Sequence, residues 1–245
     1  MLLDIKKICQ EYKIEINGLI HIGAHVGQEF NLYNQLNIEY LIFVEPQKNI
    51  FDKLYNNIPR SPKIKLYNLA LGNIVGKKTM YIDSNNQESS SILKPKMHLK
   101  QYPNIRFNEE IEVKVEKLDN IIDNNYYNCI NIDVQGYELE VFKGAKKVLN
   151  NIDYIFSEVN RDEVYEGCAK VKELDKYLLT YNFKRVETNW KGKTWGDAFY
   201  IKVDDSLISK NNFEIKRELK GLKKIYLFNQ ILYFFKWKIY RLFWR

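Results

Sequence analysis

The chain has few cysteines and no long uncharged apolar segment. Its three cysteines, Cys9, Cys129 and Cys168, are odd in number, lie far apart and form no Cys-x-x-Cys pair. This pattern argues against a disulfide framework or a zinc site and fits a reducing compartment. No apolar run reaches the ~18 uncharged residues of a membrane-spanning helix, and residues 1–10 are too charged for a signal peptide. We therefore expect a cytoplasmic protein.

Two nucleotide-binding motifs are also absent. The chain contains neither Gly-x-Gly-x-x-Gly, which is typical of dinucleotide-binding folds, nor the phosphate-binding loop Gly-x-x-x-x-Gly-Lys-Ser/Thr. A dinucleotide or a nucleoside triphosphate is therefore not the ligand that the sequence favours.

The excess of positive charge is confined to one end of the chain. The formal net charge is +7, from 38 Lys and Arg against 31 Asp and Glu. Residues 213–245 hold nine of these bases and two of these acids, so residues 1–212 hold 29 of each. A nucleic-acid footprint should spread over a face of the fold, so the neutral body disfavours nucleic acid as a partner.

The remaining composition is that of a packed domain, with 45% hydrophobic and 28% charged residues among 245. Short apolar runs alternate with helical patterns of ~10 residues, which predicts parallel strand pairing in a doubly wound α/β sheet. We assign residues 1–203 to this domain and 204–245 to a linker and a basic tail. The predicted strands are Asn17–Gly23, Tyr40–Val44, Lys63–Ala70, Lys77–Ile82, Glu110–Val115, Cys129–Val134, Ile152–Val159, and the antiparallel pair Phe183–Thr188 and Asp197–Val203. The predicted helices are Gly27–Leu36, Lys48–Asn57, Tyr137–Leu149 and Val171–Thr180.

The strongest local motif is His21-Ile-Gly23-Ala-His-Val-Gly27-Gln-Glu29, at a predicted strand-to-helix turn. Glycines there let the backbone turn tightly and approach a ligand, with helix N–H groups facing it. Glu45 ends the next strand, about twenty residues later, where a carboxylate can accept hydrogen bonds from ribose hydroxyls. The alternative is that Glu45 only caps the helix that follows Pro46.

An ordered set of strings resembles the FkbM family of S-adenosylmethionine-dependent methyltransferases over residues 17–203. The set begins with His21–Glu29, Phe43-Val-Glu45-Pro46 and Asn68-Leu-Ala70-Leu-Gly72. It continues with Ser89-Ser-Ser-Ile92, Val115-Glu-Lys-Leu-Asp119, Ile132-Asp133-Val-Gln-Gly-Tyr-Glu138, Phe142-Lys-Gly144-Ala and Ser157-Glu158-Val.

The resemblance implies a class I methyltransferase fold with a seven-stranded, mostly parallel sheet. It implies S-adenosylmethionine as cofactor and methyl transfer to oxygen, often to a hydroxyl of a sugar, a glycan or a glycosylated metabolite. It also implies that the loop of Ser89–Ser91 closes over the cofactor. The cofactor-binding residues carried over are Gly23, Ala24, Gly27, Gln28, Glu45, Pro46, Asn68, Leu69, Ala70, Ser90, Ser91 and Asp133.

One position departs from the pattern. His21 stands where most class I methyltransferases carry an acidic residue at the end of the first strand. The amino group of the cofactor is then held differently, by the backbone or by another side chain.

Asp133 and Glu158 end two neighbouring predicted strands, so the fold should bring both carboxylates to the mouth of the site. Methyl transfer to an alcohol needs a positioned base, a metal ion that stabilises the developing alkoxide, or both. We expect Asp133 and Glu158 to be the catalytic residues, with Mg²⁺ as a candidate ligand of the pair, since oxygen donors suit that ion. Trp195 offers either an apolar face for a sugar ring or a buried edge-strand side chain.

The tail carries ten aromatic residues among its 33. Interleaved bases and aromatic rings are typical of a helix at an anionic membrane surface, and eleven uncharged residues, Ile225–Phe235, are too few to span a bilayer. The alternative is packing on the body or self-association through residues 213–245.

Two other functions stay open. One is methylation of RNA or protein, although the chain lacks the Asn/Asp-Pro-Pro-Tyr/Phe tetrapeptide expected for methylation of base amino nitrogens. The other is a binding module of the same fold without activity.

Overall fold

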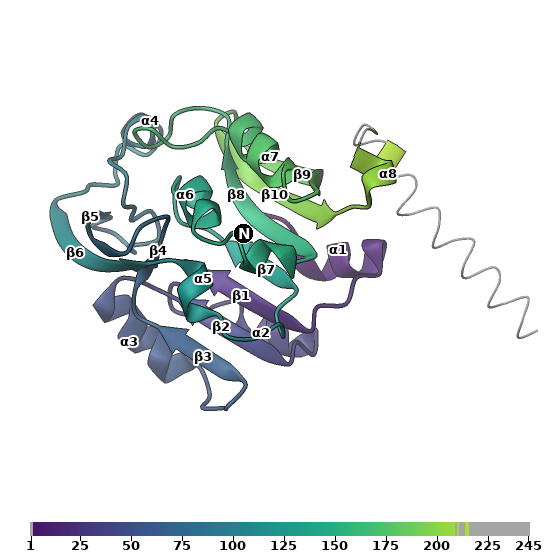
Figure 1. Ribbon diagram of the computed structural model, residues 1–245. Helices are drawn as coiled ribbons and strands as arrows, with labels where there is room; N and C mark the ends of the chain where they lie inside the picture. Colours follow the sequence, from purple (N-terminus) through teal and green to yellow (C-terminus); the bar gives the residue numbers. More distant parts are fainter. Residues whose placement is uncertain (1, 209, 211–213, 216–245) are drawn as a thin grey trace, which may run out of the picture.

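The centre of the molecule is a seven-stranded sheet. The computed structural model describes residues 2–208, 210 and 214–215. The strands lie in the order β3-β2-β1-β7-β8-β10-β9, parallel from β3 to β8, whereas β10 is antiparallel to β8 and β9 (Figure 1). The doubly wound fold is therefore confirmed. Their bounds are β1 Gly18–Ile22, β2 Tyr40–Val44, β3 Ile64–Tyr67, β7 Cys129–Ile132, β8 Tyr154–Asn160, β9 Phe183–Lys191 and β10 Trp195–Lys202.

Helices cover both faces of this sheet. In Figure 1, α1, α2 and α3 lie on one face, and α5, α6 and α7 lie on the other. The bounds are α1 Ile5–Tyr12, α2 Phe30–Gln35, α3 Lys48–Asn57, α4 Met97–Gln101, α5 Leu118–Ile121, α6 Glu138–Lys143, α7 Val171–Leu179 and α8 Asp205–Ile208, with a 3₁₀ turn at Val148–Asn150.

Alternation along the strands divides the interior into two cores. Ile20 and Ile22 of β1 pack with α6 and α7, whereas Leu19 packs on the opposite face with α1 and α3. Successive side chains of a strand point to opposite faces, so a strand buried on both sides is apolar throughout. That is why the parallel strands are continuous apolar runs in the sequence.

A second, three-stranded sheet stands beside the first. It has the order β4-β6-β5, with β4 Ala70–Leu71, β5 Gly76–Ile82 and β6 Glu109–Glu116. The predicted strand Lys63–Ala70 is therefore wrong in its extent, because it spans β3 and the start of β4. The chain changes sheets at Asn68, whose side-chain amide donates to the carbonyls of Glu45 and Pro46, each at 3.0 Å.

Two predicted helices are shorter than the periodicity suggests. The helix predicted over Tyr137–Leu149 ends at Lys143, and Gly144 follows it at a close approach to Gly72, where a Cβ would lie 1.9 Å from the Gly72 carbonyl oxygen. The Asp119 carboxylate then accepts from the Lys147 and Val148 amides, which starts the 3₁₀ turn. The helix predicted from Gly27 begins at Phe30, because residues 24–27 form a turn in which the Gly27 amide donates to Ala24.

The C-terminal predictions fall largely outside the described residues. Within the described part, Leu207 and Ile215 are buried in the core that α1 and α3 share. The predicted tail over 213–245 otherwise lies beyond it. None of the described helices has the length and apolar character to cross a bilayer.

Candidate functional site

A glycine corner connects β1 to the site at the carboxyl ends of the parallel strands. Gly23 adopts a left-handed φ of 79°, and its amide and that of Ala24 both donate to the Val44 carbonyl at 3.0 Å. A Cβ on Gly23 would lie 1.9 Å from the carbonyl oxygen of Asp133. Only glycine fits there, because the backbones that follow β1, β2 and β7 meet at this point.

A narrow apolar slot opens beside this corner, with a volume of about 60 Å³. Val44, Pro46, Leu69 and Ala70 come from β2 and the start of the small sheet, and they face side chains from β5 and from the loops after β5 and β7. The remaining apolar lining residues are Ile22, Leu71, Met80, Ile92, Val134 and Tyr137. Flat apolar walls of this kind suit an aromatic ring system.

Glu45 is the carboxylate of the slot. It is 3% exposed, and its two oxygens accept from the backbone amides of His25 at 3.0 Å and Gln47 at 2.9 Å. Burial raises the pKa of Glu45 to about 7, which these hydrogen bonds partly oppose. Gln47 is the N-cap residue of α3, so Glu45 bonds the residue before the helix rather than the amides of its first turn. Two hydrogen bonds do not occupy every lone pair of the carboxylate.

A loop of residues 83–91, here called the lid loop, lies over the slot. Side chains beneath it donate to its backbone or side chains: His25 to Asn86, Gln28 to Glu88, Gln47 to Gln87 and Asn49 to Gln87. Ser90 lines the slot, and its hydroxyl accepts from the Asp83 amide. Because these bonds are mostly exposed polar contacts, this element can open at low cost.

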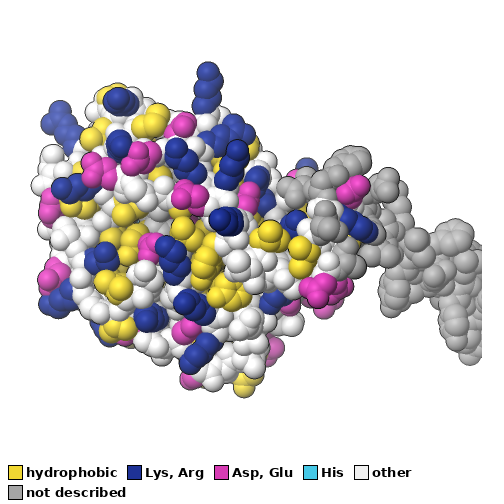
Figure 2. Space-filling view, turned by 45° about the horizontal axis from the view of Figure 1, so that its top comes forward, with side chains coloured by type: hydrophobic (Ala, Val, Ile, Leu, Met, Phe, Trp, Pro, Cys, Tyr) yellow, Lys and Arg dark blue, Asp and Glu magenta, His cyan; other side chains and the backbone are white. Residues whose placement is uncertain are grey.

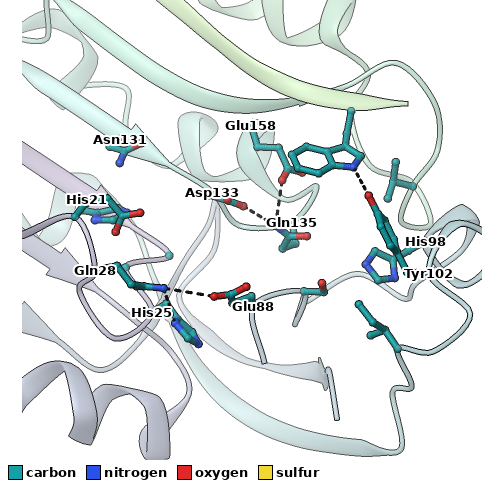
Figure 3. A pocket seen from close by; sticks show the side chains of 17 residues that line it. His21, His25, Gln28, Glu88, His98, Tyr102, Asn131, Asp133, Gln135 and Glu158 are labelled. Carbon is teal, nitrogen blue, oxygen red and sulfur yellow. Dashed lines mark hydrogen bonds between the residues drawn. The ribbon is translucent and has the colours of Figure 1, made fainter. Parts of the chain in front are cut away.

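The slot continues into a wider cavity of about 370 Å³. The two share Gly23, His25, Glu88, Asp133 and Gln135. Figure 3 shows His21, His25 and Gln28 on one side of this cavity, and His98 and Tyr102 on the other. No described residue that lines either space is Lys or Arg, whereas Glu29, Glu45, Glu88, Asp133 and Glu158 are among the lining. The site therefore favours a cationic ligand over a phosphorylated one.

Asp133 and Glu158 meet in the floor of the cavity, as their strand ends predicted. Gln135 joins them: its side-chain nitrogen donates to Asp133 Oδ1 at 2.6 Å and to Glu158 Oε2 at 3.1 Å (Figure 3). Gln135 has a left-handed φ of 54°, an uncommon conformation that tends to occur at functional sites.

Burial raises the pKa of both carboxyls. It raises that of Asp133, against the hydrogen bond from Gln135. Burial and then the charge of Asp133 raise the pKa of Glu158 well above its usual value. Two such carboxyls at one point do not both ionise readily, so the pair shares a proton.

The oxygens at this point have the chemistry that Mg²⁺ needs, but N–H donors already engage them. Ligand atoms of Asp133, Glu138 and Glu158 lie within 4.8 Å of one another. Glu138 accepts from the backbone amides of Val134 and Gly136 at 3.1 Å, and Gln135 bonds the other two carboxyls. A cation here would have to displace the Gln135 amide, so the Mg²⁺ site stays a prediction.

An aromatic wall faces these carboxyls across the cavity. Trp195 donates its indole N–H to the Tyr102 hydroxyl at 3.0 Å, and the Tyr102 ring lies 5.0 Å from that of His98. His98 is 4% exposed, and its Nδ1 has no hydrogen-bond partner among the described residues. Trp195 is thus in the cavity lining and is half-buried, as the sugar-face alternative requires.

Most of the predicted cofactor residues line the two spaces, but three do not. Gly23, Ala24, Gln28, Glu45, Pro46, Leu69, Ala70, Ser90, Asp133 and Glu158 are all in the lining. Gly27 instead packs on α3, where a Cβ would lie 2.8 Å from Leu54. Asn68 bonds the carbonyls of Glu45 and Pro46, and the Ser91 hydroxyl donates to the Gln135 carbonyl at 2.8 Å. These three residues hold the site's backbone rather than face it.

Several lining residues were outside the predicted set: Glu29, His98, Tyr102, Asn131 and Gln135. Gln135 lies inside a recognised string, and Glu29 ends the glycine motif, so their positions carried a signal. His98 lies in α4 and Tyr102 directly follows it; this helix of five residues is too short for periodicity to reveal.

Comparisons with known proteins match the family that the sequence resembles. The methyltransferase FkbM domain model matches residues 21–185. The 2-O-methyltransferase NoeI of Sinorhizobium fredii (strain NBRC 101917 / NGR234) is 26% identical over 173 residues, which cover 66% of this chain and 71% of that protein.

The solved structures that match are more distant in sequence. A protein of the NADB-Rossmann superfamily from Streptococcus agalactiae has a TM-score of 0.46 at 12% identity, covering 90% of this chain and 74% of that one. Magnesium protoporphyrin IX methyltransferase (ChlM) from Synechocystis PCC 6803, with bound S-adenosylmethionine, has a TM-score of 0.44 at 8% identity, covering 81% and 78%.

Proposed function

Since the chain belongs to the FkbM family of S-adenosylmethionine-dependent methyltransferases, we propose that it methylates a hydroxyl of a sugar or glycan. The observation that carries the proposal is the cavity that the Asp133–Glu158 carboxyl pair and aromatic rings line together (Figure 3). The name of the relative NoeI, a 2-O-methyltransferase, supports oxygen as the atom methylated.

The residues present fit the cofactor. The apolar slot would hold the adenine ring, and the buried Glu45 carboxylate would accept from the ribose hydroxyls. Acidic lining without Lys or Arg suits a sulfonium and an ammonium group. When bound, S-adenosylmethionine supplies an electrophilic methyl group.

The carboxyl pair accounts for the proton. The attacking hydroxyl must lose its proton as its oxygen bonds to carbon, and Asp133 is the carboxyl of the pair that lines both spaces. Gln135 fixes the Asp133 side chain by its hydrogen bond at 2.6 Å. The proton that the pair shares keeps a second full charge out of the floor.

The aromatic wall supports a ring-shaped acceptor. Trp195 and Tyr102 are locked to each other by a hydrogen bond, so they present rigid faces, and sugars bind to such faces through their C–H groups. On the face that Figure 2 shows, basic and acidic side chains are interspersed. An RNA acceptor would need a basic stripe instead.

The test is methyl transfer from labelled S-adenosylmethionine to a panel of sugars, glycans, RNA and protein. We expect label in carbohydrate, and an Asp133→Asn variant should lower kcat by about 10²- to 10⁴-fold, as for loss of a general base. Lys172→Ala, an exposed change on α7 outside the site, should have no effect. Full activity of Asp133→Asn would remove that residue from proton transfer, and label only in RNA or protein would replace the acceptor class.

Mg²⁺ remains a further proposal for the same carboxyl pair, supported only by its oxygen donors. Exhaustive chelation followed by addition of Mg²⁺ is the test. Recovery of activity with Mg²⁺ supports the ion, whereas undiminished activity after chelation rejects it.

A lipid-linked acceptor would explain the basic, aromatic tail, and we propose that the tail binds an anionic membrane surface. Flotation with anionic vesicles should carry the full chain upward, and a Lys236→Glu, Lys238→Glu, Arg241→Glu variant should stay behind. Substitutions are preferable to truncation because Ile215 packs in the core. Equal flotation of both chains, or a dimer that persists in the variant, would favour self-association instead.

A further inference from the structure

A buried hydrogen-bond chain links Asn131, Tyr33 and His21. The Asn131 side-chain amide donates to the Tyr33 hydroxyl oxygen at 2.7 Å, and that oxygen lies 3.2 Å from Nδ1 of His21. While Tyr33 accepts from Asn131, its own proton can be donated to Nδ1. A neutral imidazole that accepts at Nδ1 is protonated at Nε2.

The ring is held neutral and in one orientation. His21 is 4% exposed, and Tyr33 and Asn131 are buried beside it. Burial lowers the pKa of His21, against the charge of Glu29. The Tyr33 and Phe43 rings contact it with centroids 5.7 Å and 5.9 Å away. His21 is therefore an uncharged donor through Nε2, for which the described residues provide no acceptor.

A carboxylate lies close to this donor. Glu29 precedes α2 and lines the same cavity. Its carboxylate caps nothing and has no hydrogen-bond or ion-pair partner among the described residues, and its charge acts on both His21 and Asp133. The other charged or titratable side chains that line the cavity are His25, Glu88, His98, Tyr102, Asp133 and Glu158. None of them bears a permanent positive charge that would pair with Glu29.

The position of these two groups relative to the slot defines what they can bind. A ligand with its nucleoside in the slot passes Gly23 and Asp133 into the wider cavity, because these residues line both. There it meets His21 on one side, whereas the aromatic wall with His98 and Tyr102 lies on the other (Figure 3). The cavity thus has one end for the rest of the cofactor and one for the acceptor.

We propose that His21 and Glu29 bind the amino-acid end of the cofactor, with His21 Nε2–H donating to its carboxylate and Glu29 accepting from its ammonium group. The inference rests on the proposed cofactor site. His21, at the position where most class I methyltransferases carry an acidic residue, would bind the carboxylate of the cofactor. The acidic residue that binds the ammonium group would instead be Glu29.

The test compares ligand affinities rather than activity. S-adenosylhomocysteine has both groups, 5′-(3-aminopropylthio)adenosine lacks the carboxylate, and the desamino analogue of S-adenosylhomocysteine lacks the ammonium. Calorimetry with the full chain measures the Kd of each. We expect His21→Phe, which keeps a flat ring against Tyr33 and Phe43, to weaken S-adenosylhomocysteine about 10-fold and the aminopropyl compound less than twofold.

Glu29→Gln tests the ammonium-binding role independently. Because Glu29 is half-exposed, this substitution should not disturb the fold. We expect a similar loss for S-adenosylhomocysteine and no loss for the desamino analogue. Tyr33→Phe, which removes the hydroxyl that selects the tautomer, should weaken S-adenosylhomocysteine about threefold and leave the aminopropyl compound unaffected.

Three results would overturn the inference. They are equal losses for all ligands in a variant, unchanged affinities throughout, and a reversed pattern in which His21→Phe weakens only the ligand that lacks the carboxylate. If the unaltered chain binds none of the adenosyl ligands, the proposed cofactor site fails as a whole, which is a different result. Should His21→Phe fail to fold, Glu29→Gln and Tyr33→Phe still decide the question.

Discussion

Burial determines the pKa of the Glu45 carboxyl. Its ordinary pKa of 4.5 rises to about 7 because the carboxylate loses its water, although two backbone amides donate to it. The residue therefore changes charge close to neutral pH. Ribose hydroxyls donate to the ionised form more strongly than to the acid.

This leads to a pH dependence of cofactor affinity. Below its pKa Glu45 is neutral, so the affinity for S-adenosylhomocysteine should fall as pH decreases through about 7. Glu45→Gln keeps the shape and one acceptor, and it should bind more weakly by about 1–3 kcal/mol at pH 8 with a flatter profile. Calorimetry from pH 6 to 8.5 measures both curves, with circular dichroism as the folding control. Parallel curves for the two chains would assign the titration to another group.

At the scale of elements, the lid loop borders the slot and contributes Gln87, Glu88 and Ser90 to its lining. Gln87 has a left-handed φ of 67° and bonds Gln47 and Asn49. Because the bonds of the loop are mostly exposed, we expect it to move outward as the ligand enters and then to order around the ligand.

Hydrogen exchange can detect this movement. In the free protein, amides of residues 84–90 should exchange much faster than those of β1 and β7, because their bonds are exposed. Saturating S-adenosylhomocysteine should slow exchange in the lid loop by about 10-fold, and α7, far from the slot, serves as the internal control. Exchange in the lid loop that is insensitive to ligand would mean that the cofactor enters elsewhere.

For the whole molecule, several buried carboxyls make folding depend on pH. Burial raises the pKa of Glu45 and Glu138 to about 7 and that of Asp197 to about 6, the last against hydrogen bonds from the Leu2 and Leu3 amides. Between about pH 4.5 and 7 the folded chain thus holds protons that the unfolded chain has released. Stability falls with rising pH wherever the folded state binds more protons.

The free energy of unfolding should therefore decrease by a few kcal/mol from pH 5 to pH 7.5. Urea denaturation at both values, followed by tryptophan fluorescence, is the measurement. Glu45→Gln removes one of the three groups and should reduce the difference. A chain that becomes more stable as pH rises across this range would contradict the assignment of these carboxyls as buried acids.

Local patterns in the sequence determined the strands and much of the site. β2 and α3 begin and end at the predicted residues, Tyr40–Val44 and Lys48–Asn57, because apolar runs and periodicity act within one segment. Gly23 was predictable for the same reason, since a left-handed turn needs glycine whatever surrounds it. Glu45 was predictable from its place at the end of the next strand. By contrast, residue 144 must be glycine because Gly72 lies against it, which the sequence of the helix does not reveal.

Only the tertiary structure decided how distant segments share the site. Gln135 bonds Asp133 and Glu158 at once, Trp195 bonds Tyr102 from the short helix region of α4, and Asn131 reaches His21 through Tyr33. Ser91 and Asn68 matched a motif yet bond the backbone. A sequence specifies which side chains are available near a turn, but their partners depend on packing between strands and loops that are remote along the chain.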